Sequence, residues 1–206
     1  MIAGALAGVT RVLCGPAVVW RCNPRTPRQR VYFANHTSHL DFVLIWSAFP
    51  ADVRRSVRPV AGSDYWARGP LRRYLAGFVF RAVLVDRTGG GVARLAAAGT
   101  PIERIAEQMG AHDSIILFPE GTRGCGAEPA AFKSGLFHLT RLRPDVELIP
   151  VYLENLNRIL PKGEVLPVPM LSRLVFGPPL AVPACEDKPA FLERARAALL
   201  RLRDSQ

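Results

Sequence analysis

The sequence predicts an α/β fold in which a mixed, mostly parallel sheet is flanked by helices, with an apolar helix at the N-terminus. Two observations predict it: short apolar runs alternate with helix-like segments, and most of the runs stop at polar or turn-forming residues. The length of 206 residues suits one domain with a full core. We therefore expect one catalytic or binding unit, with ligands gathered at the strand ends.

Strands are expected where short apolar runs are bounded by turn residues. These runs are 31–34, 57–61, 82–85, 114–118, 147–153 and 174–176. Helices are expected over 40–49, 101–109, 132–142 and 189–203, with a short one capped by Ser63-Asp64. Thr100-Pro101-Ile102-Glu103 is a capping box with proline at the first helical position. The proline-rich stretch 160–170 is expected to be a connection.

The first 20 residues are predicted to be an apolar helix, separate from the main domain over 21–206. The helix would end at Trp20 and be followed by basic residues, an order typical of an interfacial anchor on an anionic leaflet. Gly15-Pro16 makes the stretch too broken to span a bilayer. The same composition fits a first helix packed on the core, and the sequence leaves both interpretations open. The basic residues are Arg21, Arg25, Arg28 and Arg30.

Positive charge is concentrated in the first half of the chain. Residues 1–100 contain 14 basic and 4 acidic side chains, whereas residues 101–206 contain 13 of each. A one-sided positive field favours an anionic membrane surface, nucleic acid, or a phosphorylated or acidic partner. Nucleic acid is not expected, because the sequence has no basic helix, zinc knuckle or aromatic ribonucleoprotein-type strand. The dominance of Arg over Lys fits phosphate contacts or a GC-rich codon usage equally.

Neither a metal nor a cofactor is expected. The four cysteines are scattered without a CxxC pair, which favours a reduced cytosolic setting. His36, His39 and Asp41 include metal-ligand types, but they would need further ligands. No cleaved signal peptide is expected either, since no basic residue precedes the first apolar stretch.

Polar residues follow three of the predicted strands, at 35–41, 86–87 and 120–123. If these ends lie side by side, they share one site. His36 follows a strand, and Asp41 begins the next helix. This spacing lets the carboxylate accept from one ring nitrogen, fix the tautomer and raise the basicity of the other nitrogen. The spacing also fits a loop histidine that caps a helix.

The segment from Phe118 to Arg123 combines a tight turn with a carboxylate, a hydroxyl and a guanidinium. Such a turn suits an anionic ligand that carries a hydroxyl group. Arg123 and Arg87 are candidates to grip a phosphate, and Lys133 adds a third charge. The alternative is that Arg123 pairs with Glu120 and that Arg87 pairs with its neighbour Asp86.

Four segments resemble the conserved blocks of the glycerolipid acyltransferases, the family of 1-acylglycerol-3-phosphate acyltransferases. Asn35-His36-Thr37-Ser38-His39-Leu40-Asp41 resembles the NHxSxxD block, and Phe118 to Arg123 resembles the FPEGTR block. Leu148 to Val151 is similar to the fourth, proline-centred block. Residues 83–87 resemble the second block because they include its arginine, Arg87. Arg81-Ala82 stands where this block usually has a glycine followed by an aromatic residue. The blocks come in family order over residues 31–153.

The resemblance implies acyl transfer from acyl-CoA or acyl carrier protein to the free hydroxyl of lysophosphatidic acid, giving phosphatidic acid in phospholipid biosynthesis. Residues 21–206 would then be the acyltransferase catalytic domain, with His36 as general base and Asp41 as its partner. Other expected partners are the membrane lipid acceptor and an anionic membrane surface. The expected location is the cytoplasmic face of the membrane, peripheral or monotopic. The predicted substrate-binding residues are Glu120, Gly121, Thr122, Arg123, Arg87 and Lys133.

Three alternatives stay open. An enzyme with the same chemistry would use another lysophospholipid or an acylated amino acid lipid as acceptor. A membrane-binding module would use the basic half of the chain without catalysis. A metal-dependent hydrolase would lose its activity on chelation.

Overall fold

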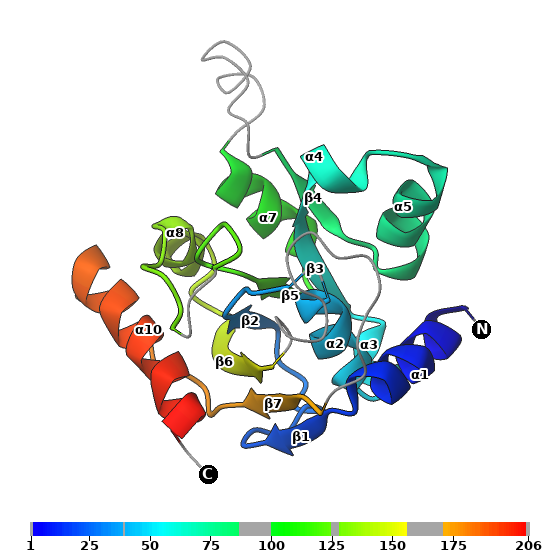
Figure 1. Ribbon diagram of the computed structural model, residues 1–206. Helices are drawn as coiled ribbons and strands as arrows, with labels where there is room; N and C mark the ends of the chain where they lie inside the picture. Colours follow the sequence, from blue (N-terminus) through cyan, green and yellow to red (C-terminus); the bar gives the residue numbers. More distant parts are fainter. Residues whose placement is uncertain (1, 39, 87–99, 125–127, 156–170, 205–206) are drawn as a thin grey trace.

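A computed structural model describes residues 2–38, 40–86, 100–124, 128–155 and 171–204. They form a seven-stranded sheet in the order β1-β7-β6-β2-β5-β3-β4 (Figure 1). All neighbouring strands are parallel except β6 and β7, which are antiparallel. The predicted α/β fold with a mixed, mostly parallel sheet is therefore confirmed.

The elements follow the predicted order with some additions. The strands are β1 (Ala17–Trp20), β2 (Arg30–Ala34), β3 (Val57–Gly62), β4 (Val83–Val85), β5 (Ser114–Leu117), β6 (Glu147–Glu154) and β7 (Arg173–Phe176). The helices are α1 (Ile2–Cys14), α2 (Asp41–Ala48), α3 (Ala51–Arg54), α4 (Ser63–Trp66), α5 (Pro70–Tyr74), α7 (Pro101–Met109), α8 (Gly135–Leu142) and α10 (Lys188–Asp204). A π-helical turn, η1 (Leu75–Val79), directly follows α5.

Local sequence signals account for most of these elements. The capping box is present at the start of α7, where Thr100 and Glu103 exchange side-chain and backbone hydrogen bonds. The six predicted strands are all present with slightly different bounds. The helix expected over 132–142 is shorter and begins at Gly135. The expected connection over 160–170 lies outside the described residues.

The apolar helix predicted over residues 1–20 is wrong in its last part. Helix α1 ends at Cys14, and Ala17–Trp20 form an edge strand that pairs in parallel with β7. Gly15 has φ +44°, a conformation that ends a helix, and Pro16 has no N–H to continue one. The Trp20 ring stacks on Phe176 at 3.7 Å between ring centroids, so it packs within the fold.

Helices cover both faces of the sheet, which gives three layers (Figure 1). Tyr32 and Ala34 of β2 belong to a core cluster with α1 and α2, whereas Val31 and Phe33 belong to a cluster with α7, α8 and α10. Successive strand residues point to opposite faces, so β2 is buried on both sides. This burial explains why the run is apolar without alternation.

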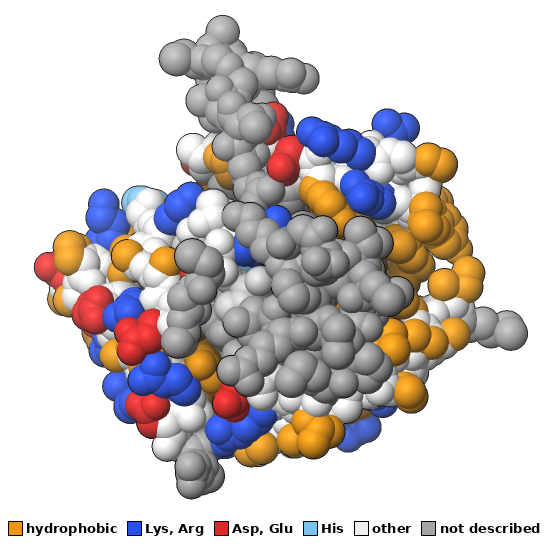
Figure 2. Space-filling model, in the orientation of Figure 1, with side chains coloured by type: hydrophobic (Ala, Val, Ile, Leu, Met, Phe, Trp, Pro, Cys, Tyr) orange, Lys and Arg blue, Asp and Glu red, His pale blue; other side chains and the backbone are white. Residues whose placement is uncertain are grey.

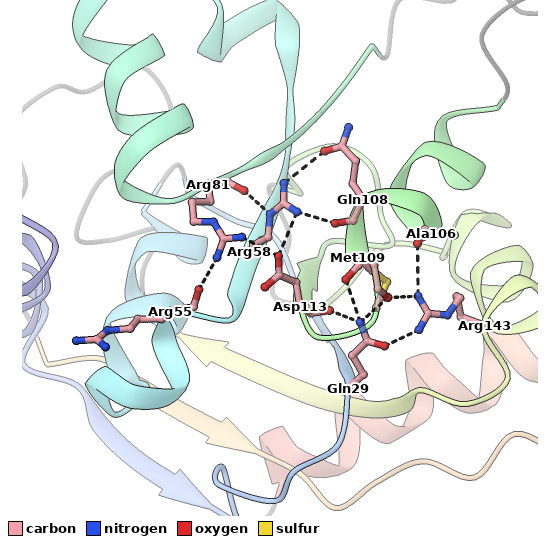
Figure 3. A network of polar contacts seen from close by, with 10 residues as sticks. Gln29, Arg55, Arg58, Arg81, Ala106, Gln108, Met109, Asp113 and Arg143 are labelled. Atoms are coloured by element: carbon pink, nitrogen blue, oxygen red, sulfur yellow. Dashed lines mark hydrogen bonds and ion pairs between the residues drawn. The ribbon is translucent and has the colours of Figure 1, made fainter.

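A polar network ties the amino ends of the central strands together (Figure 3). Gln29, just before β2, donates to the carbonyl oxygens of Met109, Gly110 and Asp113 at 2.8–3.1 Å. The Asp113 carboxylate accepts from Arg58 at 3.3 Å and from Arg81 at 3.0 Å. These arginines therefore stabilise the end of the sheet opposite the strand ends where ligands are expected.

Arg81 adopts a left-handed backbone conformation, with φ +50°. This region is unfavourable for a side chain with a Cβ atom and favours glycine. It is the position at which a glycine is usual in the second block. In this protein, side-chain contacts stabilise the arginine at this position, because its guanidinium donates to the Arg55 carbonyl oxygen at 2.8 Å and to Asp113.

The basic residues that follow β1 are partly structural. Arg30 is only 3% exposed and pairs with Glu147 at 2.9 Å. Arg25 pairs on the surface with Asp52 at 3.0 Å, and Arg28 lies 3.5 Å from Glu147. The interfacial role predicted for this group therefore does not suit Arg30, whose charge is inside the fold.

Within the described ranges, none of the helices combines the length and apolar character needed to cross a membrane. Over the same residues, no group of three or more His, Cys, Asp or Glu side chains is arranged to hold a metal ion.

Candidate active site

His36 and Asp41 form a hydrogen-bonded pair at the carboxyl end of β2. Strand β2 ends at Ala34, and α2 begins at Asp41. The intervening loop brings His36 Nδ1 to 2.8 Å from Asp41 Oδ2. The pair predicted from the spacing is therefore formed. His39, the third residue considered as a metal ligand, lies outside the described residues.

Asp41 is a fully buried carboxylate that accepts all its hydrogen bonds on one oxygen. Besides His36, the backbone N–H groups of Thr37 and Ser38 donate to Oδ2 at 2.6 and 2.8 Å. Its position in the first turn of α2 adds the favourable helix dipole. Oδ1 is buried, and no hydrogen-bond partner is found for it among the described residues. The loop is therefore organised around Oδ2.

The other ring nitrogen of His36 is available for chemistry. The side chain is 17% exposed, and no described residue bonds to Nε2. The ring stacks on Phe118 at 4.2 Å between centroids, with 21° between the planes. Asp41 and Phe118 together fix the ring orientation. Phe118 is the first residue of the FPEGTR block, and its stacking role was missed in the sequence because ring contacts depend on strand pairing.

Asn35 joins the site loop to the neighbouring strand β6. Its side-chain amide donates to the Leu153 carbonyl oxygen at 2.9 Å and accepts the Leu153 N–H at 2.8 Å. The side chain thus continues the β2–β6 ladder one residue past the end of β2. This anchor explains the asparagine that precedes the histidine, a role that was not predicted from the sequence.

Glu120 contacts the backbone of the site loop. It is buried, its Oε1 accepts the His36 N–H at 2.8 Å, and its Oε2 accepts the Ala130 N–H at 2.8 Å. Nearby, the Gly124 N–H donates to the His36 carbonyl oxygen at 2.8 Å. Glu120 of the FPEGTR block and Gly124, the residue after the block, therefore hold the backbone of His36 from both sides. The alternative ion pair between Glu120 and Arg123 is not formed.

Gly121 of the FPEGTR block lies beside Lys133. Gly121 has φ +71°, and a Cβ atom there would lie 2.8 Å from Lys133 Nζ, so the lysine side chain crosses the face of the glycine. Thr122 is exposed, and Arg123 is half-buried. Among the described residues, neither Arg123 nor Lys133 has an ion-pair partner. The substrate-binding roles of Glu120, Gly121, Thr122, Arg123 and Lys133 stay predictions.

The predicted strand ends are not all neighbours. Strands β2 and β5 are adjacent, which explains the contact between His36 and Glu120. Strand β4, which ends at Val85, is separated from β5 by β3. Arg87, two residues further on, lies outside the described residues, so its predicted role in binding is untested.

Residues 22–154 match a sequence family described as Acyltransferase. The chain is 32% identical over 141 residues to the 1-acyl-sn-glycerol-3-phosphate acyltransferase of Escherichia coli, covering 63% of this chain and 51% of that protein. It is 27% identical over 175 residues to the human 1-acyl-sn-glycerol-3-phosphate acyltransferase alpha, covering 82% of this chain and 57% of the human protein. The chain thus spans about half the length of these relatives.

The fold matches a solved structure over the whole chain. The crystal structure of the 1-acyl-sn-glycerophosphate (LPA) acyltransferase PlsC from Thermotoga maritima superimposes with a TM-score of 0.76. The match covers 100% of this chain and 79% of that one, at 18% identity. At this identity the likeness establishes the architecture.

Proposed function

Because the chain belongs to the acyltransferase family, we propose that it moves a fatty acyl group from acyl-CoA or acyl carrier protein to the free hydroxyl of lysophosphatidic acid, giving phosphatidic acid. The observation that carries this proposal is the 2.8 Å pair between His36 and the buried Asp41, held beside the FPEGTR block. A histidine whose second nitrogen is available suits the removal of a proton from a hydroxyl group.

In the proposed mechanism, His36 is the general base. Its Nε2 takes the proton of the acceptor hydroxyl as the hydroxyl oxygen attacks the thioester carbonyl carbon. The tetrahedral intermediate collapses with cleavage of the carbon–sulfur bond, and the imidazolium returns the proton to the departing thiolate. Asp41 keeps the proton on Nδ1 and stabilises the imidazolium. The acyl group passes directly to the acceptor.

The acceptor phosphate would be bound by the cations of the FPEGTR block and its surroundings. Arg123 and Lys133 are the described candidates, because neither forms an ion pair with another described residue. Gly121 leaves the space that the Lys133 side chain occupies. Thr122 offers a hydroxyl for the glycerol backbone, and Arg87 is proposed to add a charge. Charge-assisted hydrogen bonds from such groups are the strongest that a phosphate receives.

Location at the cytoplasmic face of the membrane, peripheral or monotopic, is part of the proposal. Both the lysolipid acceptor and the product are membrane lipids. The net charge of +10 favours an anionic bilayer and an acidic carrier protein.

The function is tested by supplying one radiolabelled acyl donor with a panel of lysolipids and identifying the product by mass spectrometry. Acylation of lysophosphatidic acid is expected. If other lysolipids of the panel are acylated and lysophosphatidic acid is not, the acceptor in the proposal is wrong. His36→Ala, shown to be folded by circular dichroism, should lose nearly all transfer. Activity at the parent rate would contradict the mechanism. Vesicle binding without any turnover would instead support a binding module, and loss of turnover in EDTA would support a metal-dependent enzyme.

A further inference from the structure

Large apolar side chains are exposed on two separate segments of the chain, α1 and the stretch formed by α5 and η1. Val12 of α1 is 82% exposed, Leu71 of α5 is 68% exposed and Phe78 of η1 is 79% exposed. Figure 2 shows hydrophobic side chains gathered along one edge of the molecule, over α5 and α1. Exposed apolar groups that gather in this way mark an interaction site. We name as the apolar face the side chains of Ile2, Val9, Val12, Leu71, Tyr74 and Phe78.

Both segments are joined to the helix that begins with Asp41. Arg11 of α1 donates to the carbonyl oxygens of Ser47 and Phe49 at the end of α2. Phe80, which follows η1, contacts the rings of Phe42 and Trp46 in α2 at 5.0 and 5.1 Å between centroids. The apolar face therefore has a fixed place relative to the His36–Asp41 pair.

The charge around the apolar face is mostly positive in the sequence. From the start of α4 to the end of β4, residues 63–85 contain four arginines and one acidic residue, Asp64, and residues 2–14 contain one arginine and no acidic residue. Arg68, Arg72 and Arg73 are exposed beside Leu71 and Tyr74. Two of them are oriented by local contacts: Arg72 lies 4.2 Å from the Tyr65 ring centroid, and Arg73 donates to the Ala67 carbonyl oxygen. Apolar side chains bordered by arginines complement acyl chains beneath anionic headgroups.

We infer that the apolar face, together with Arg68, Arg72 and Arg73, is the surface by which this protein docks on an anionic lipid bilayer. The inference rests on the proposed function and places the membrane contact on α1, α5 and η1. A second copy of the chain is a poorer occupant, because a two-fold contact through this face would bring three exposed arginines of each copy together against one exposed carboxylate, Asp64, of each.

The test is cosedimentation of the full chain with vesicles of equal parts phosphatidylcholine and phosphatidylglycerol, compared with phosphatidylcholine alone. The parent should prefer the anionic vesicles, and the preference should weaken with salt. Replacing Leu71 and Phe78 by Ser should lower the partition coefficient about tenfold or more for each side chain. Replacing Arg68 and Arg72 by Gln should lower it about fivefold for each charge.

Two matched variants lie away from the face. Leu142→Ser removes an exposed leucine of α8, and Arg201→Gln removes an exposed arginine of α10. Both helices lie on the other side of the molecule from α1 and α5 (Figure 1). These variants should bind vesicles like the parent. Circular dichroism and melting temperature show whether every variant is folded.

Vesicle binding by the folded Leu71→Ser/Phe78→Ser variant at the parent level would overturn the inference. Equal losses in the α8 and α10 controls would overturn it as well, since binding would then be general. A dimer that dissociates in the face variant, with vesicle binding unchanged, would assign the face to a second copy. Acyl transfer is measured separately, so a parent that docks but transfers nothing refutes the proposed function and leaves the docking face supported.

Discussion

Replacing Asp41 by Asn separates the charge of the dyad from its geometry. The three donors to Asp41, which are His36 Nδ1 and the N–H groups of Thr37 and Ser38, all converge on Oδ2. An asparagine placed with its amide oxygen at that position would accept all three. Its NH2 group would occupy the position of Oδ1, for which no described residue provides a hydrogen bond. The substitution should therefore keep the loop and remove the negative charge.

The expected loss follows from the charge that His36 acquires during transfer. An imidazolium and a carboxylate whose charges lie about 4 Å apart attract by about 4 kcal/mol at an effective dielectric constant of about 20. Each 1.4 kcal/mol corresponds to about a factor of ten in rate. Asp41→Asn should thus lower kcat by roughly a thousandfold. The buried NH2 group without an acceptor should also cost about 1–3 kcal/mol of folding stability.

The assay is release of the thiol from the acyl donor, followed at saturating acceptor, together with the melting temperature. Asp52→Asn is the matched control, because that carboxylate is exposed and pairs only with Arg25 on the surface. It should keep the parent kcat. A folded Asp41→Asn protein with more than about a tenth of the parent kcat would show that His36 does not depend on this charge. A double variant with His36→Ala should be no slower than His36→Ala alone, because the two residues act as a unit.

Three further outcomes are expected. Glu120→Gln places an NH2 group against one of the two backbone N–H groups that donate to Glu120, so it should cost about 1–3 kcal/mol of folding stability. It should also lower kcat, because Glu120 positions the backbone of His36. A raised KM for the acceptor with kcat unchanged would instead indicate that Glu120 binds the acceptor directly. Arg81→Gly should be more stable than Arg81→Ala by about 1 kcal/mol in urea unfolding, because both lose the side chain but only Ala keeps the strain at φ +50°; equal stabilities would contradict this. Burial raises the pKa of Tyr32 to about 12 in the folded protein, whereas a tyrosine in the unfolded chain ionises near pH 10. Ionisation of the unfolded chain therefore lowers the free energy of unfolding by about 2–3 kcal/mol as the pH rises from about 10 to about 12. The fall should be smaller in Tyr32→Phe and unchanged in Tyr74→Phe, whose ring is exposed; identical curves for both would refute the assignment.

The chemistry of the dyad is predictable from sequence because it is local. His36 and Asp41 are separated by one loop, so the end of a strand and the start of a helix suffice to place them together. The order of the strands is not local. A site shared by all three strand ends required the end of β4 to lie beside the others, but β3 lies between β4 and β5. Apolar runs of similar composition do not specify which neighbour they pair with.

The role of Glu120 shows the same limit at the level of one side chain. A carboxylate in a turn after a strand suits a ligand, an ion pair with Arg123 or a backbone contact. The choice depends on the pairing of β2 with β5, which brings the His36 N–H to 2.8 Å from Oε1. Strand β1 was missed for a related reason. The four apolar residues after Gly15-Pro16 have a composition similar to that of the helix before them. They form a strand because they pair with β7, which comes much later in the chain.

The excess of positive charge in the first half has two physical origins that composition cannot separate. Arg30, Arg58 and Arg81 pair with acidic residues that come later in the chain, so part of the asymmetry is cancelled by folding. Arg68, between α4 and α5, and Arg72 of α5 belong to a stretch, residues 63–85, in which four arginines outnumber a single acidic residue, Asp64. Reversing the charge of Arg30 would mix unfolding with any loss of docking, because Arg30 is buried and pairs with Glu147. The electrostatic contribution to membrane binding is therefore measured at the exposed arginines beside the apolar face, where a change of charge leaves the core intact.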